Sequence, residues 1–290
     1  MNDRLISPTR KGILIGSPGS GRNRLRGVAN DMINKHEFML SPRGGVWRKN
    51  EISVLDNPTI VEVITEVHSS CADFQEVYYS GHGCQDEAGN EFICLQDGNL
   101  SVDYLFNQNG PRQFAILDSC RKYYATISGF PKEVERRQYA TGYSEARAAF
   151  DNYILNSPSG KMIMYATGTG DVAIDNRDGH GGEFTLALLK GIYSIEATQG
   201  IQPVFPAAAL QNAKRILLES GHSQIPELIN LEGALNIPLG LASPDFLQQD
   251  IVLQHRQQIM QQMAQSKQQN TAETAIGVAL IGLVLWGLSK

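Results

Sequence analysis

The chain has 290 residues, a formal net charge of −5 and 42% hydrophobic residues. This composition excludes a disordered or collagen-like chain and a multi-span membrane protein, and no long basic block provides a nucleic-acid-binding surface. The four cysteines are too few and too irregularly spaced for a disulfide scaffold, and no apolar N-terminal stretch resembles a signal peptide. We therefore expect one or two globular domains in a reducing, cytoplasmic setting.

Short apolar runs and amphipathic stretches alternate along the chain up to residue 241. Strands are predicted over residues 11–15, 51–55, 76–80, 91–95, 113–117 and 161–167, with a last apolar segment over 226–231. Helices are predicted over residues 27–38, 58–67, 102–106, 183–192 and 206–219. Because parallel strands need crossover connections, this alternation favours an α/β fold with a mostly parallel sheet covered on both faces. Residues 121–159 interrupt it, and we expect a long, partly helical excursion there.

The C-terminal segment differs from the rest of the chain. Ten of the 22 residues from 248 to 269 are glutamine, and residues 274–289 carry no charge. We predict a globular domain over residues 1–241, a Gln-rich helical linker over 242–270 and a hydrophobic helix over 271–290. The uncharged run spans only about 24 Å as a helix, against about 30 Å of hydrocarbon. Two interpretations stay open: a tail anchor at the inner face of a membrane, or a helix that packs on protein.

Two neighbouring predicted strands are followed by residues that can carry out catalysis. His82 comes after the strand at 76–80, and Cys120 comes after the strand at 113–117. The carboxyl ends of parallel strands line the crevice where ligands bind, so the two side chains can face one another. An imidazole can take the proton of a thiol and later deliver one to a leaving amine. The amides of Gly83 and Cys120 could then bind an oxyanion. Taken singly, each side chain is also compatible with a purely structural role.

Three motifs resemble those of a known family: YYSGHG at 78–83, LDSC at 117–120 and LRGVANDM at 25–32. They are similar to the signatures of the caspase-like cysteine peptidases, closest to the metacaspase and orthocaspase branch. Segments 161–175, 181–192 and 224–240 resemble the small-subunit half of these enzymes. The resemblance implies a three-layer α/β/α sandwich around a six-stranded, mostly parallel sheet. It also implies a His82–Cys120 dyad.

The resemblance also implies a specificity pocket. Matched residue by residue, the acidic S1 pocket of that branch falls on Asp31, Ser80 and Asp118. Two carboxylates in a narrow pocket hold a guanidinium or ammonium group and repel an acidic side chain. We therefore expect protein substrates to be cleaved after Arg or Lys. Taken alone, Asp31 could equally suit a helix dipole, and Asp118 could cap a turn.

The sequence departs from that branch after the cysteine, where Arg121, Lys122 and Tyr123 replace the frequent His-Ser-Gly, and at Val28, where many relatives carry a second cysteine. The chemistry requires no cofactor. The acids near the region where some metacaspases bind calcium lack EF-hand spacing, and the resemblance leaves calcium open; they are Asp171, Asp175 and Asp178. We expect no zinc site, because no second Cys/His pair completes one.

Self-processing in the excursion is a hypothesis, because an enzyme specific for basic side chains could cut at the Lys and Arg residues there, namely Arg121, Lys122, Lys132, Arg136, Arg137 and Arg147. A solvated, charged loop is the alternative. At the level of function, the alternative to an Arg/Lys-specific endopeptidase is an inactive or differently specific caspase-like scaffold associated with a membrane.

Overall fold

The computed structural model describes residues 7–69, 71–121, 143–174 and 181–246. The first compact unit of the chain ends at Phe246, whose side chain is buried. Strand β11 (Gly240–Ala242) and the short 3-10 helix η4 (Pro244–Phe246) therefore continue the domain past residue 241. The hydrophobic helix predicted over 271–290, and all of the linker beyond residue 246, lie outside the described residues. Among the described residues, no helix combines the length and apolar character that crossing a bilayer requires.

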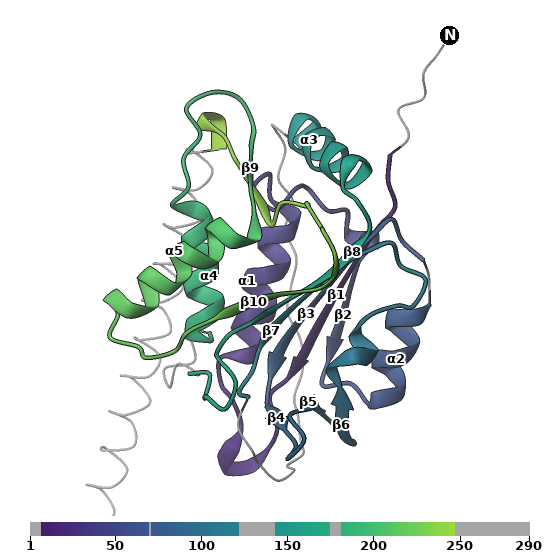
Figure 1. The fold of residues 1–290 in the computed structure, drawn as a ribbon, viewed down its shortest axis with the longest axis vertical. Coiled ribbons are helices and arrows are strands. Elements are labelled where there is room, and N and C mark those ends of the chain that lie inside the picture. Colours follow the sequence, from purple (N-terminus) through teal and green to yellow (C-terminus); the bar gives the residue numbers. More distant parts are fainter. Residues whose placement is uncertain (1–6, 70, 122–142, 175–180, 247–290) are drawn as a thin grey trace, which may run out of the picture. The chain divides into compact units, whose positions relative to one another are not determined.

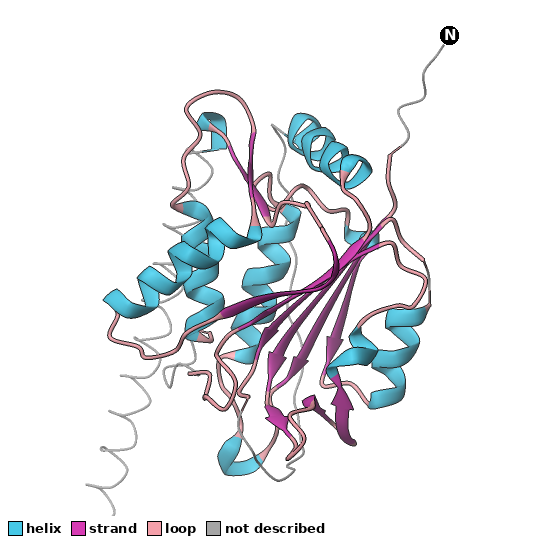
Figure 2. Ribbon diagram, viewed as in Figure 1, coloured by secondary structure: helices cyan, strands magenta, loops and turns pink. Residues whose placement is uncertain are grey.

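The domain is built on a six-stranded sheet with the order β10-β8-β7-β3-β1-β2. Its strands are β1 (Arg10–Ser17), β2 (Ile52–Asp56), β3 (Phe74–Gly81), β7 (Arg112–Asp118), β8 (Gly160–Tyr165) and β10 (Glu227–Gly233). The pairs are parallel except for β10, which runs antiparallel to β8 at one edge. Figure 2 shows these strands as one twisted layer. The mostly parallel six-stranded sheet predicted from the sequence is confirmed.

Alternate residues of the central strands enter two separate cores. In β1, Leu14 belongs to one hydrophobic cluster, whereas Ile13 and Ile15 belong to the other. The first cluster includes residues of α1 (Val28–Leu40), α3 (Tyr143–Asn156), α4 (Glu183–Tyr193) and α5 (Pro206–Glu219). The second includes residues of α2 (Ile60–His68), the 3-10 helix η3 (Val102–Leu105) and the small sheet of β4 (Gly83–Gln85), β5 (Glu91–Leu95) and β6 (Gly98–Ser101). Figure 1 shows α2 and α1 on opposite sides of the sheet. The sandwich thus has three layers.

Two predicted helices differ from the structure in detail. The helix expected from Pro58 begins at Ile60, because Thr59 caps it: the Thr59 hydroxyl accepts a hydrogen bond from the Glu62 amide, and the Glu62 carboxylate accepts one from the Thr59 amide. The short helix expected at residues 102–106 is the 3-10 helix η3. The remaining short elements are η1 (Gly21–Asn23), η2 (Lys49–Glu51) and β9 (Gln202–Val204), which pairs with β11.

The carboxyl ends of β1, β3 and β7 lie at one edge of the sheet, at the lower end of Figure 1. In the parallel register Ser80 stands beside Gly16 of β1 and beside Asp118 of β7. The residues that follow β3 and β7 are therefore adjacent in space although 38 residues separate them. Helix α1 starts from the same edge, because it follows β1.

Candidate active site

His82 and Cys120 leave the sheet from neighbouring strands. His82 lies between the end of β3 and the start of β4, and Cys120 comes two residues after the end of β7. Since Ser80 pairs with Asp118, each functional side chain sits two residues beyond a register pair. The structure thus places both predicted residues at the carboxyl edge of the sheet, as their positions in the sequence suggest.

A backbone carbonyl orients the imidazole of His82. Its Nε2 lies 2.7 Å from the carbonyl oxygen of Asn23 in η1. Because a carbonyl only accepts hydrogen bonds, Nε2 carries the hydrogen in the neutral ring, and Nδ1 keeps the lone pair of a base. Gly19 lets the loop before η1 approach this ring: its φ is +68°, and a Cβ there would lie 2.7 Å from the His82 Cδ2.

Gly83 packs directly against the backbone of the cysteine loop. A Cβ at Gly83 would lie 2.5 Å from the carbonyl oxygen of Cys120 and 2.8 Å from the hydroxyl of Ser119. Only glycine allows so close an approach, so the histidine and cysteine segments meet at this point. The thiol of Cys120 points toward the loop after β8, where its Sγ lies 3.5 Å from the carbonyl oxygen of Ala173.

The three predicted pocket residues lie together beside Cys120. Asp31 Oδ2 accepts a hydrogen bond of 2.8 Å from the Ser80 hydroxyl, and Asp31 and Asp118 are only 1% and 6% exposed. Both acids, Ser80 and Cys120 line one cavity of about 20 Å³. That volume holds about one water molecule. The pocket is therefore acidic, next to the thiol, and too small for an amino-acid side chain.

The N-terminal end of α4 closes this pocket. Asp31 Oδ1 accepts a hydrogen bond of 2.8 Å from the Gly182 amide. Asp118 Oδ2 accepts bonds from the amide and the hydroxyl of Thr185, at 3.1 and 2.6 Å. A Cβ on Gly182 would lie 2.3 Å from that same oxygen, so a larger residue could not pack here. Peptide dipoles at a helix start suit anionic partners, which explains why α4 rests on two carboxylates.

The pKa of Tyr78 is influenced by both acids, Asp31 and Asp118. Burial, followed by the charges of Asp31 and Asp118, raises the pKa of Tyr78 well above its usual value. Its hydroxyl lies 2.6 Å from that of Thr185, which itself donates to Asp118. The protonated Tyr78 therefore donates to Thr185. The charges of both carboxylates raise the pKa of the same buried hydroxyl, so the two negative groups lie close together in the pocket.

Comparison with known proteins gives the family of the chain. A sequence profile described as the caspase domain matches residues 10–232. The chain belongs to the caspase-domain family. The family is one of cysteine peptidases. A solved structure of caspase-1 from Spodoptera frugiperda resembles the chain with a TM-score of 0.50 and 13% identity, covering 79% of this chain and 90% of that one. At this identity the likeness shows the fold alone. A search of curated proteins finds no match.

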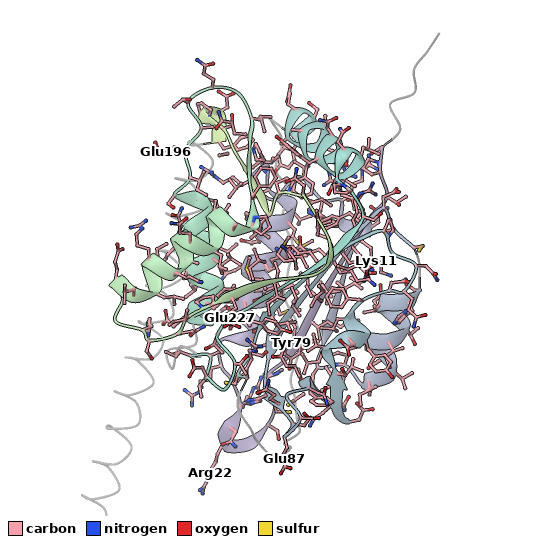
Figure 3. All side chains as sticks on the ribbon, in the orientation of Figure 1. Lys11, Arg22, Tyr79, Glu87, Glu196 and Glu227 are labelled. Atoms are coloured by element: carbon pink, nitrogen blue, oxygen red, sulfur yellow. The ribbon has the colours of Figure 1, made fainter. Side chains whose placement is uncertain are left out.

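Arg121 anchors the cysteine loop of the caspase domain. Its guanidinium forms ion pairs with Glu91 of β5 and Glu227 of β10, and it lies 4.0 Å from the centroid of the Tyr165 ring. Figure 3 labels Glu227, the first residue of β10. The Arg121 amide also donates to the carbonyl of Asp171, over 3.0 Å. The residue after the candidate nucleophile thus ties together the hairpin beside His82, the edge strand and the loop after β8.

This anchoring corrects part of the self-processing hypothesis. Arg121 is only 6% exposed and is ion-paired, and Arg147 lies in α3 with ion pairs to Glu51 and Asp151. Neither can enter a protease active site from the folded domain, because cleavage requires an extended, accessible chain. The other basic residues named for self-processing lie outside the described residues: Lys122, Lys132, Arg136 and Arg137.

The calcium question concerns the same region. Among the described residues, no group of three or more His, Cys, Asp or Glu side chains could hold a metal ion. Asp171 is exposed, and its carbonyl accepts from Arg121. Asp175 and Asp178 lie outside the described residues.

Three residues of the site were missed by sequence reasoning. Asn23 acts through its backbone carbonyl, which no side-chain pattern can reveal. Gly182 and Thr185 meet the acids only because α4 begins on top of them. The sole signal for these two was the resemblance of segment 181–192 to the family, which did not assign them a role.

Proposed function

We propose that this caspase domain is a cysteine endopeptidase that cleaves protein substrates after Arg or Lys. The observation that carries the proposal is the pair of buried carboxylates, Asp31 and Asp118, in one cavity with Cys120. A basic side chain bound there would place its own carbonyl carbon near the thiol. An acidic side chain would be repelled by two negative charges.

The chemistry then follows from the positions of the side chains. His82, with Nε2 hydrogen-bonded to the Asn23 carbonyl, takes the Cys120 proton on Nδ1. The thiolate attacks the substrate carbonyl, and the amides of Gly83 and Cys120 stabilise the oxyanion. The imidazolium next protonates the leaving amine, which leaves an acyl-enzyme thioester. Water, activated by the neutral imidazole, hydrolyses this thioester and restores the thiol.

Substrate entry requires the pocket to open. A cavity of about 20 Å³ cannot hold an arginine side chain, and Gly182 and Ile174 line it. The carboxylates already accept hydrogen bonds from Gly182 and Thr185. A substrate guanidinium would replace these neutral donors with a bidentate ion pair, which adds the attraction between opposite charges to the hydrogen bonds. Binding is therefore coupled to a shift at the start of α4.

The triad of Asp31, Ser80 and Asp118 also supports placement in the metacaspase and orthocaspase branch. Val28, which stands where many of those relatives carry a second cysteine, lines the pocket with an apolar wall. An auxiliary thiol at that position is therefore absent from this chain. The pocket acids are the observation that supports our proposal of this branch.

We further propose that the uncharged segment at residues 274–289 tethers the enzyme to the cytoplasmic face of a membrane. Support comes from the composition of this segment and from its separation in sequence from the peptidase domain. Sedimentation of membranes from cells that express the full chain tests this. The protein should be in the pellet and be released by detergent but not by salt; a soluble full-length chain would overturn the tether.

A peptide assay tests the peptidase proposal. Purified full-length protein is given matched fluorogenic peptides that end in Arg, Lys or Asp, with and without calcium. We expect hydrolysis of the Arg and Lys peptides and none of the Asp peptide. Activity should disappear in Cys120→Ala and in His82→Ala. A variant distant from the site, Cys71→Ser, should keep full activity. Cleavage of the Asp peptide alone would overturn the specificity, and no cleavage of any peptide would favour the inactive scaffold.

A further inference from the structure

Cys84 and Cys94 lie side by side next to the candidate histidine, and the peptidase mechanism uses neither of them. Cys84 pairs with Phe92 across the β4–β5 ladder, and Gly83 pairs with Ile93. Cys94 comes two residues after Phe92, so both cysteines project from the same face of the hairpin. The opposite face carries Ile93 and Leu95, which are buried in the core.

The two thiols also influence one another electrostatically, since each is the main cause of the shift in the other's pKa. Asn99 of β6 stands directly opposite Cys94, and its Nδ2 lies 3.5 Å from the Cys84 sulfur. The two sulfurs and this amide therefore occupy one small polar site. The exposed Cys71 lies elsewhere, beside the Asn109 carbonyl.

The backbone of Cys94 is joined to that of His82. The Cys94 amide donates to the His82 carbonyl over 2.9 Å. The Tyr79 hydroxyl lies 2.6 Å from the carbonyl oxygen of His82 and 3.0 Å from that of Cys94. Figure 3 labels Tyr79 within the sheet, and Glu87 on the β4–β5 turn. Any displacement of Cys94 is thus transmitted to the residue that carries the imidazole.

We propose that Cys84 and Cys94 form a peroxide-sensitive dithiol that closes to a disulfide and displaces His82. Diagonal neighbours in a ladder lie about 7–8 Å apart at Cα, and a disulfide needs about 6 Å. Closure therefore brings the two Cα atoms closer by about 1–2 Å. Strand β4 is only three residues long and begins directly after His82, so this end of the hairpin can move.

The reaction balances with hydrogen peroxide as the oxidant. The Cys84 thiolate attacks one peroxide oxygen; the S–O bond forms, the O–O bond breaks, and the departing hydroxide leaves as water with the proton of the thiol. Cys94 sulfur then attacks Cys84 sulfur; the S–S bond forms, the S–O bond breaks, and a second water leaves with the Cys94 proton. The sulfurs are oxidised and the peroxide is reduced. A dithiol reductant reverses the change.

Within this proposal Cys84 is the attacking sulfur, because its pKa is lowered while that of Cys94 is raised. The hydrogen bond with the Cys94 side chain lowers the pKa of Cys84 to about 7, against the opposing effects of burial and of the nearby Asp86 carboxylate. The same contact and burial raise the pKa of Cys94. Thiolate is the reactive species toward peroxide, so Cys84 reacts first and Cys94 resolves.

Peptide mapping tests the proposal without relying on peptidase activity. The full-length Cys120→Ala variant, which lacks the candidate nucleophile, is treated with hydrogen peroxide, blocked with N-ethylmaleimide and cut with a glutamyl endopeptidase. Glu87 and Glu91 lie between the two cysteines, so the digest separates them unless they are bonded. We expect a disulfide-linked pair of peptides that dithiothreitol releases.

Matched variants keep the test decisive. The link should survive in Cys71→Ser and be absent in Cys84→Ser, and Cys94→Ser should accumulate a Cys84 sulfenic acid that dimedone traps. The same peptide mapping is carried out on wild type, so that the test does not depend on the folding of Cys120→Ala. The proposal would be overturned if Cys84 and Cys94 stayed reduced at peroxide doses that oxidise Cys71. A disulfide between Cys94 and Cys120 in wild type would also overturn it.

The effect on activity is a separate measurement that rests on the proposed function. Peroxide followed by catalase should lower hydrolysis of the Arg peptide at least tenfold, with recovery in dithiothreitol. Peroxide also attacks Cys120, so the comparison is with Cys94→Ala, in which the disulfide cannot form. Equal losses in both proteins, with the Cys84–Cys94 link mapped in wild type, would show that the disulfide forms without displacing His82.

Discussion

The Ser80 hydroxyl donates a 2.8 Å hydrogen bond to Asp31 Oδ2 across 49 positions of sequence. This bond joins the end of β3 to the first turn of α1. Because Ser80 stands two residues before His82, the pocket acid and the candidate base are held by the same strand end. The proposed specificity pocket and the candidate base are therefore connected through one strand end.

Neutralising Asp118 should separate binding of a basic side chain from catalysis. Asp118→Asn keeps the shape of the residue but removes the charge, and hydrogen bonds to charged groups are worth about 1.5–3 kcal/mol. We expect kcat/KM for an Arg peptide to fall about 10- to 100-fold. A peptide with a small neutral side chain should change by less than about threefold.

Asp171→Asn serves as the control, since Asp171 is an exposed acid outside the pocket lining. It should leave both peptides unaffected. If Asp118→Asn lowered hydrolysis of the two peptides equally, Asp118 would have no role in selecting a basic side chain.

Adding a methyl group at Gly83 should disable the enzyme. The new Cβ would lie 2.5 Å from the Cys120 carbonyl, so the histidine and cysteine segments must separate. Misplacing reacting groups by about 1 Å can cost about 100-fold in rate, and we expect at least that loss in kcat. Gly168→Ala is the matched control, because its Cβ would meet nothing nearer than 3.4 Å. Comparable kcat values for the two variants would remove Gly83 from the site.

Arg121→Met should destabilise the domain by about 3 kcal/mol, because it leaves the carboxylates of Glu91 and Glu227 without their buried partner. Urea denaturation followed by circular dichroism measures this. Arg215→Met breaks the exposed ion pair with Glu219 and should cost less than about 0.5 kcal/mol. Equal midpoint shifts for the two variants would mean that Arg121 does not anchor the cysteine loop.

Alkylation of Cys84 should follow its lowered pKa. The thiolate fraction rises with pH through about 7, so the rate of Cys84 carbamidomethylation by iodoacetamide should reach half its maximum there. Cys94→Ala removes the hydrogen bond and should move this midpoint upward. Site-resolved peptide mapping on the Cys120→Ala background measures it. A midpoint that stays near 7 in Cys94→Ala would assign the shift to another group.

Much of the scaffold could be predicted from local sequence. The apolar runs at 11–15 and 113–117 have strand periodicity and lie within β1 and β7, and the helix predicted at 206–219 matches α5, with Pro206 at its first position. The antiparallel direction of β10 could not be predicted. Strand direction depends on the path of the preceding loop rather than on the side chains of the strand.

The candidate site, like the scaffold, has some residues that the sequence predicts and others that it cannot predict. His82 and Cys120 are recognisable because they follow apolar strands, and the pocket acids come from the family resemblance. The Asn23 carbonyl and the closure of the pocket by Gly182 depend on tertiary contacts between distant segments. The burial of Arg121 also depends on tertiary contacts. Its sequence context indicates a solvated loop, but two carboxylates from different strands and the Tyr165 ring surround it.

An affinity label tests together whether Cys120 is the nucleophile and whether the adjoining pocket selects basic side chains. A peptidyl-arginine chloromethyl ketone is incubated with the full-length protein, and the modified residue is located by mass spectrometry. We expect one adduct, on Cys120, that is lost in His82→Ala, formed much more slowly in Asp118→Asn and absent with the aspartyl analogue. Labelling of Cys120 at equal rates by the arginyl and aspartyl reagents, or labelling of another cysteine in its place, would contradict it.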